Sequence, residues 1–127
     1  MTQEKKTILI VDDEKSILDL LKETFTNEDI EVIRALNGKE GLKLALEKQP
    51  DLILLDIIMP EMGGLTMLRE LRKNEWGKNA RVIILSNLSN NEKIAEAVAE
   101  GAYDYLVKTE CSMDDVVQKA KERLGLK

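Results

Sequence analysis

Acidic residues directly follow two of the apolar runs in this sequence. Asp12 and Asp13 come after the run 8–11, and Asp56 comes after the run 52–55. If these runs form neighbouring strands, the three carboxylates lie close enough to repel one another. A hard divalent cation held by oxygen ligands relieves such repulsion. The pattern therefore indicates a metal site, and magnesium is the expected ion.

A hydroxyl and an ammonium group follow two further apolar runs. Ser86 comes after 82–85, and Lys108 comes after 105–107. A serine hydroxyl can donate a hydrogen bond, and a lysine ammonium can pair with a phosphoryl oxygen. Together with the metal they suit transfer of a phosphoryl group to Asp56, in which the aspartate attacks phosphorus in line and the cations offset the negative charge.

Alternating elements are predicted to position these groups. Strands are expected at 8–11, 30–35, 52–55, 82–85 and 103–107, and helices around 17–25, 42–46, 65–71, 94–98 and 116–124. Three of the strand segments are apolar without alternation, which is typical of strands covered on both faces. Right-handed crossovers then favour an α/β fold, an open, doubly wound parallel sheet with its site at the carboxyl edge of the strands.

Local signals refine this arrangement. Glu31 and Arg34 dilute the second strand, and Asp104 dilutes the fifth, as suits strands at the edges of a sheet. Ser112 followed three residues later by Asp115 predicts a capping-box-like start for the last helix.

Composition excludes several classes of function. The chain has 127 residues, no histidine, one cysteine (Cys111) and a net charge of -5. It has no apolar stretch near the ~20 residues of a membrane span and no signal-peptide pattern, so we expect a cytoplasmic protein without membrane contact. Its lysines and arginines are interspersed with glutamates, which argues against nucleic-acid binding.

Four features of the chain resemble the receiver domains of two-component response regulators, especially standalone chemotaxis-type receivers. They are ILIVDDE at 8–14, LLDIIMP at 54–60, Ser86, and YLVK at 105–108. Each is weak alone, but their order at successive strand ends is specific. The resemblance implies one receiver domain over 1–127 with no effector domain. It also implies a flavodoxin-like five-stranded sheet in the order 2-1-3-4-5, with helices on both faces.

The same resemblance implies a role for each group at the strand ends. Asp56 would be the phospho-acceptor, and Asp12, Asp13 and Asp56 would bind Mg²⁺ (or Mn²⁺) together with the backbone carbonyl of Ile58.

Ser86 and Lys108 would contact the phosphoryl group, and Ser86 would act with Tyr105 as the conformational switch. A histidine kinase or phosphotransfer domain would be the donor. A downstream protein would bind the face formed by the fourth helix, fifth strand and fifth helix, and a homodimer is possible. Such a domain catalyses its own phosphorylation and slow dephosphorylation but does not turn over an external substrate.

Some positions depart from the family pattern. Thr109 stands where most receivers have a proline joined by a cis bond, which leaves the placement of Lys108 open. Asn87 is larger than the usual residue beside the phosphoryl pocket. In receivers, two positions flank the path of the hydrolytic water, and the resemblance places Ile58 and Leu88 there. Both are apolar, so we expect a long-lived phosphorylated state.

Alternatives remain open at this level. Aspartates after strands also cap helices and turns, so each assignment alone is weak. A receiver-like module that binds partners without phosphorylation is the main rival, and phosphodonor labelling discriminates between the two. An aspartyl-nucleophile phosphatase is disfavoured because Ile58 stands where that family places a second aspartate.

Overall fold

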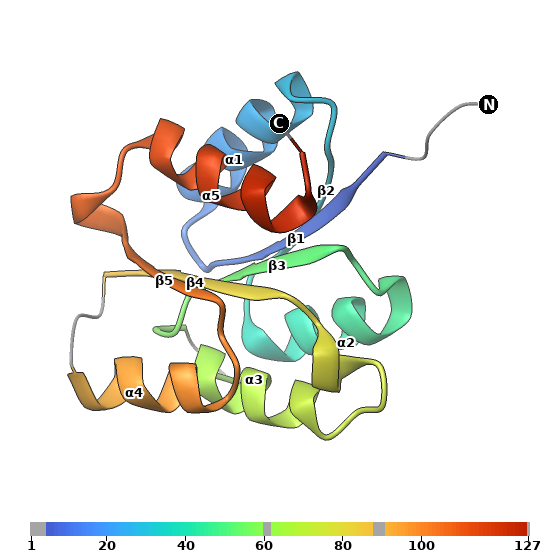
Figure 1. Ribbon diagram of the computed structural model, residues 1–127, viewed down its shortest axis with the longest axis vertical. Coiled ribbons are helices and arrows are strands. Elements are labelled where there is room, and N and C mark those ends of the chain that lie inside the picture. Colours follow the sequence, from blue (N-terminus) through green and yellow to red (C-terminus); the bar gives the residue numbers. More distant parts are fainter. Residues whose placement is uncertain (1–4, 60–61, 88–90, 127) are drawn as a thin grey trace.

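The computed structural model describes residues 5–59, 62–87 and 91–126. Strands and helices alternate as predicted (Figure 1). The strands are β1 (Thr7–Val11), β2 (Glu31–Ala35), β3 (Leu52–Leu55), β4 (Val82–Ser86) and β5 (Asp104–Val107). The helices are α1 (Lys15–Asn27), α2 (Gly38–Lys48), α3 (Gly64–Arg72), α4 (Asn91–Ala99) and α5 (Met113–Leu124), with short 3-10 turns η1 (Gly77–Asn79) and η2 (Lys108–Glu110).

The sheet has the expected parallel order β2-β1-β3-β4-β5. Its centre is fixed by register: Ile10 of β1 lies opposite Leu54 of β3 on one side and Arg34 of β2 on the other. The two strands whose sequences are diluted by charge, β2 and β5, form the edges. The doubly wound, flavodoxin-like prediction is therefore confirmed.

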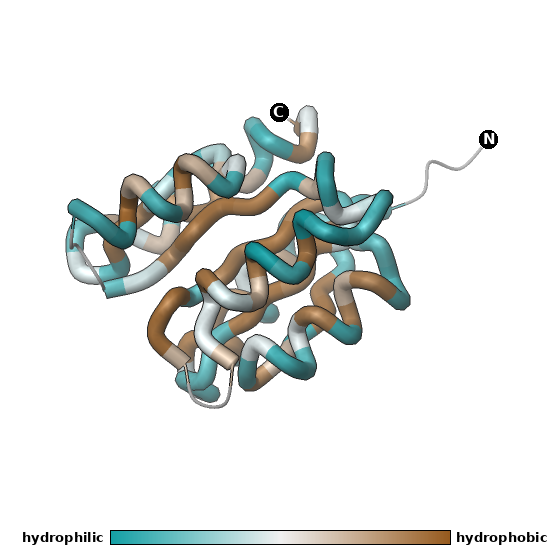
Figure 2. Tube along the Cα trace, turned by 90° about the horizontal axis from the view of Figure 1, so that it is seen from below, coloured by the Kyte–Doolittle hydropathy of each residue, from teal (hydrophilic) through white to brown (hydrophobic). Residues whose placement is uncertain are grey.

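Successive side chains of each central strand enter two separate cores. Leu9 and Val11 of β1 pack beneath α2, α3 and α4, whereas Ile8 and Ile10 pack beneath α1 and α5. Figure 2 shows continuous hydrophobic strands between helices in which hydrophilic and hydrophobic residues alternate. Burial on both faces explains why these strands lack the alternation of a half-exposed sheet.

Capping residues fix where helices begin and end. The Asn37 side chain accepts a hydrogen bond from the Glu40 N–H at the start of α2. Ser112 and Asp115 form the predicted reciprocal capping box at the start of α5. Within the described residues, no helix is both long and apolar enough to cross a bilayer.

Candidate functional site

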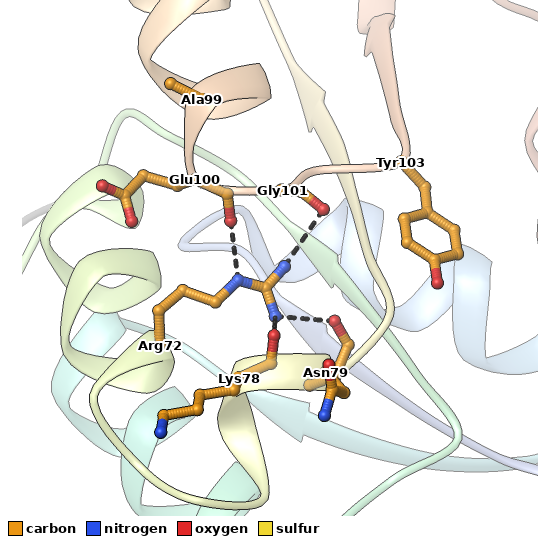
Figure 3. Close-up of a pocket in the computed structure, with 8 residues that line it drawn as sticks. Arg72, Lys78, Asn79, Ala99, Glu100, Gly101 and Tyr103 are labelled. Atoms are coloured by element: carbon orange, nitrogen blue, oxygen red, sulfur yellow. Dashed lines mark hydrogen bonds between the residues drawn. The ribbon is translucent and has the colours of Figure 1, made fainter.

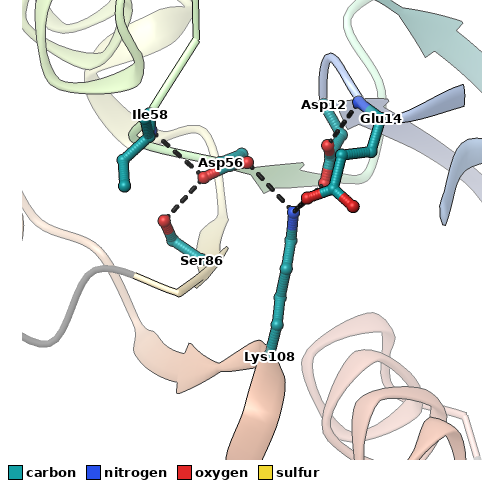
Figure 4. A network of polar contacts seen from close by, with 6 residues as sticks. All are labelled: Asp12, Glu14, Asp56, Ile58, Ser86 and Lys108. Atoms are coloured by element: carbon teal, nitrogen blue, oxygen red, sulfur yellow. Dashed lines mark hydrogen bonds and ion pairs between the residues drawn. The ribbon is translucent and has the colours of Figure 1, made fainter.

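The predicted site residues meet at the carboxyl edge of the sheet (Figure 4). Asp12 follows β1, Asp56 follows β3, Ser86 ends β4 and Lys108 follows β5. Parallel strands bring their carboxyl ends to one edge, so residues 96 positions apart in sequence become neighbours through topology alone. Asp12, Asp56 and Ser86 are the buried polar residues of the described chain.

Three donors fix the Asp56 carboxylate, which is 4% exposed. Its Oδ1 accepts a hydrogen bond from the Ser86 hydroxyl at 2.6 Å and another from the Ile58 N–H at 3.1 Å. Its Oδ2 accepts from the Lys108 ammonium at 3.0 Å. A buried carboxylate held by charged and neutral donors keeps one orientation, which an in-line nucleophile requires.

The Lys108 ammonium joins several carboxylates. Its Nζ lies 2.7 Å from Asp12 Oδ2, 3.0 Å from Asp56 Oδ2 and 3.1 Å from Glu14 Oε1. Burial alone lowers the pKa of Lys108, but hydrogen bonds to Asp12, Asp56 and Glu14 outweigh burial and raise the pKa well above its ordinary value. The ammonium is therefore charged throughout the physiological pH range.

Three carboxylates lie close enough to hold one cation. Asp12, Asp13 and Asp56 each offer an oxygen, and these oxygens lie within 4.8 Å of one another. Burial raises the pKa of Asp12, although hydrogen bonds from Lys108 and the Glu14 N–H act in the opposite direction. The negative charge of Asp12 is thus incompletely compensated. This donor set of hard oxygens fits a magnesium ion.

A pocket of about 210 Å³ gives access to these groups. It is lined by Asp13, Glu14, Asp56, Ile58, Asn87 and Lys108. The Ile58 side chain stands at its rim and is 55% exposed. Asn87 also lines the pocket and is exposed. Leu88, the other predicted apolar flank, lies outside the described residues.

The two predicted switch residues lie on neighbouring strands, Ser86 at the end of β4 and Tyr105 within β5. Ser86 is fully buried against Asp56. Tyr105 is half-buried and packs against the core on the α2, α3 and α4 side of the sheet. Burial raises the pKa of the Tyr105 phenol, and the negative charge of Asp56 raises it further.

A family model described as the response regulator receiver domain matches residues 8–121. This chain belongs to the response regulator receiver family. The resemblance inferred from the strand-end motifs is confirmed, and with it a place in two-component signalling.

Two relatives illustrate the receiver's range of contexts. The chemotaxis protein CheY of Thermotoga maritima is 36% identical over 104 residues, covering 81% of this chain and 85% of CheY. The regulatory protein AtoC of Escherichia coli is 36% identical over 123 residues, covering 94% of this chain but 26% of AtoC. The chain thus spans about a quarter of AtoC.

Solved structures share the receiver fold. A CheY-like receiver protein from Methanospirillum hungatei has a TM-score of 0.89 at 31% identity, covering 96% of this chain and 95% of that chain. The response regulator TrrA from T. maritima, in complex with Mg²⁺-BeF, has a TM-score of 0.81 at 38% identity, covering 93% of this chain and 98% of that chain. The CheX-CheY-BeF3-Mg²⁺ complex from Borrelia burgdorferi has a TM-score of 0.84 at 31% identity, covering 92% of this chain and 87% of that chain.

The departure at Thr109 does not displace the receiver's lysine. Within the described residues every peptide bond is trans, including Lys108–Thr109. The chain continues from Lys108 into the 3-10 turn η2, and the ammonium still reaches Asp12 and Asp56.

Sequence reasoning assigned no role to two further residues at the receiver site. Glu14 pairs with Lys108, and the only sequence signal was an acid directly after the Asp12–Asp13 pair. Gly64 begins α3 against the backbone of Asp56, where an added Cβ would collide with the Asp56 carbonyl oxygen. The Gly63–Gly64 pair was visible in the sequence, but the close approach that requires Gly64 was not.

A larger pocket, of about 480 Å³, lies near the opposite edge of the sheet, before β4 and β5 (Figure 3). The Arg72 guanidinium there donates to the carbonyl oxygens of Glu100 at 2.6 Å, Ala80 at 2.7 Å, Gly77 at 2.8 Å and Gly101 at 3.1 Å. Its donors are occupied by main chain, so this pocket holds a structural clamp between α3 and the start of β5.

Proposed function

We propose that this receiver accepts a phosphoryl group on Asp56 from a histidine kinase or phosphotransfer domain. Magnesium would bind Asp12, Asp13, Asp56 and the Ile58 carbonyl. The observation that carries the proposal is the buried Asp56 carboxylate, which faces a pocket and is held between the Ser86 hydroxyl and the Lys108 ammonium.

In the proposed step a carboxylate oxygen of Asp56 attacks phosphorus, and the bond from phosphorus to the donor histidine nitrogen breaks with its electron pair left on nitrogen. Lys108 offsets negative charge that develops on the phosphoryl oxygens. Magnesium, when bound, adds positive charge at the same oxygens. The Mg²⁺ and BeF or BeF3 named in the TrrA and CheX-CheY structures support this assignment.

The output would pass through α4, β5 and α5. As the Ser86 hydroxyl turns to the phosphoryl group, Tyr105 would change its packing and alter that face for a downstream protein or a second copy of the chain. The CheX-CheY complex supports a protein partner for a receiver of this type. A cytoplasmic location stays a prediction from the sequence.

The test is incubation with a small phosphodonor and magnesium, followed by intact-mass measurement. The wild type should gain one phosphate, and Asp56→Asn should gain none because the amide keeps the shape but cannot act as the nucleophile. Asp114→Asn, at an exposed aspartate in the first turn of α5, is the matched control and should label fully.

Two outcomes would contradict this proposal. Labelling of Asp56→Asn equal to the wild type would show that the acceptor is another residue. A wild type that gains no phosphate would favour a receiver that acts only by binding partners.

A further inference from the structure

One carboxylate beside Lys108 does not belong to the metal cluster. The ammonium contacts Asp12, Asp56 and Glu14, but the acids that converge within 4.8 Å are Asp12, Asp13 and Asp56. An ammonium has three N–H donors, one for each of its three carboxylate partners. Glu14 is therefore the partner of Lys108 that a metal ion at the acidic cluster leaves available.

A metal ion at the acidic cluster and the Lys108 ammonium would compete for two shared carboxylates. A divalent ion at the acidic cluster and the Lys108 ammonium both draw on Asp12 and Asp56. Like charges that close repel strongly where water is largely excluded, and the Lys108 side chain is 9% exposed. Binding of the ion is easier if the ammonium has a negative partner of its own.

The backbone places Glu14 to be that partner. Glu14 is the N-cap residue of α1, and its N–H donates to Asp12 Oδ1 at 2.9 Å. Its side chain makes no capping hydrogen bond, so the carboxylate is available to Lys108. Figure 4 shows it beside Asp12, facing the end of the lysine. The Glu14 side chain is 49% exposed, which places it at the solvent side of the ammonium.

We propose that Glu14 is a positioning residue that holds the Lys108 ammonium when magnesium occupies Asp12 and Asp56, and that it thereby strengthens magnesium binding. This inference rests on the proposed function. Lys108 then stays beside Asp56 without depending on the carboxylates that bind the metal. Glu14 contacts neither the metal nor the phosphoryl group.

The experiment is a magnesium titration of the unphosphorylated full chain followed by amide chemical shifts. Glu14→Gln removes the charge, and Glu14→Asp keeps the charge but shortens the side chain so that it loses the contact. Both should raise the magnesium Kd by roughly twofold to fivefold, as expected for one partly exposed ion pair. Glu23→Gln, at an exposed glutamate of α1, is the matched charge control and should leave the Kd unchanged.

The Asp variant separates contact from charge. If Glu14→Asp binds magnesium like the wild type while Glu14→Gln binds it weakly, Glu14 acts only through its overall charge and the proposal is overturned. Equal affinity for all four proteins also overturns it. A wild type that binds no magnesium contradicts the proposed function and this inference together.

A double-mutant cycle tests whether Lys108 mediates the effect. In a Lys108→Met background the loss caused by Glu14→Gln should be much smaller, because no ammonium remains to be held. The same fold-change in both backgrounds would show that Glu14 and Lys108 act independently, and would overturn the proposal. Amide spectra of each variant without magnesium verify that the fold is retained.

Discussion

Two cations, Lys108 and Arg72, lie at opposite ends of the parallel strands and have different partners. Lys108 is surrounded by the carboxylates of Asp12, Asp56 and Glu14. Arg72 donates to main-chain carbonyls, including those of Glu100 and Ala80. The first set of partners is charged, and two of its members can bind another cation. The second set is neutral and fixed by the backbone.

This difference separates a responsive site from a structural one. Removal of hydrogen bonds to Arg72 leaves carbonyls that only water can satisfy. At the other site, a metal ion would compensate the carboxylates around Lys108, and a phosphoryl group would give the ammonium a new anionic partner. Burial lowers the pKa of Arg72, whereas the carboxylates around Lys108 overcome its burial and raise its pKa.

The largest expected effect is a loss of stability in both cation variants with a different response to magnesium. Lys108→Met leaves its carboxylates uncompensated and should lower the free energy of unfolding by about 3 kcal/mol. Arg72→Met should cost about 2 kcal/mol. Saturating magnesium should narrow the gap between Lys108→Met and wild type but not the gap for Arg72→Met, as measured by urea denaturation.

Arg69→Met is the control for these variants, because its guanidinium makes an exposed ion pair with Glu96 and should contribute less than about 1 kcal/mol. Equal responses of Lys108→Met and Arg72→Met to magnesium would contradict the distinction between the two ends of the strands.

A second variant removes a proposed metal ligand without changing Lys108. Asp13→Ala should weaken magnesium binding at least ~10-fold, since the ion loses both a charge and an oxygen ligand. Stability without magnesium should not fall, because Asp13 is exposed and its charge only adds to the repulsion. An unchanged magnesium affinity in a metal titration would show that Asp13 is a turn residue and not a metal ligand.

The lifetime of the phosphorylated state provides a smaller effect. Ile58→Asn places a polar group at the rim of the pocket, where it can orient a water toward phosphorus, and should speed decay by roughly threefold to tenfold. Ile58→Val keeps the rim apolar and is the matched control. Decay is followed by loss of the phosphate mass at fixed pH and magnesium. Equal decay rates for the two variants would show that the apolar rim does not determine the lifetime of the phosphorylated state.

The smallest effect concerns a third cation, Arg123, at the surface. It donates to Asp104 at 2.7 Å and 3.2 Å, and this hydrogen bonding lowers the pKa of Asp104 despite partial burial. A carboxyl group whose pKa is lowered by folding stabilises the folded state at pH values above its ordinary pKa. This stabilisation is lost as the pH falls through the folded-state pKa. Asp104→Asn should therefore cost about 0.5 kcal/mol at pH 7, since the pair is partly exposed.

Below about pH 4 the loss of stability caused by Asp104→Asn should shrink, because protonation removes the negative charge of Asp104 in the wild type too. Urea denaturation of both proteins across this range is the measurement. A cost that does not vary with pH would assign the effect to packing instead of charge.

The sequence was sufficient to predict the fold because its strongest signals are short apolar runs, helical spacing and capping pairs. The strand Leu52–Leu55 was predicted with its observed bounds, and β1, β2, β4 and β5 differ from prediction by one residue at one end. The capping box at Ser112 was visible as a pair of residue types at fixed spacing. Such signals are local, so they can be read without coordinates.

Site contacts were harder to predict because they cross the sheet. The parallel sheet brings Asp12, Asp56 and Lys108 to one edge, which the alternating pattern predicted, whereas the strand order came from the resemblance to receivers. The contact between Glu14 and Lys108 depends on the helix entry angle and side-chain direction, which no spacing encodes. The trans bond at Thr109 was likewise open until the backbone path was known.

The two neighbouring glycines before α3 differ in what evolution or an engineer can do with them. An added methyl group at Gly63 would meet the Ile57 carbonyl oxygen at 3.4 Å, an ordinary contact, so this position can acquire new side chains. At Gly64 the same methyl group would collide with the carbonyl of the residue proposed to carry the phosphoryl group. A saturation library should therefore tolerate many residues at the first position and almost none at the second. Substitutions that adjust this loop are therefore expected at Gly63 and not at Gly64.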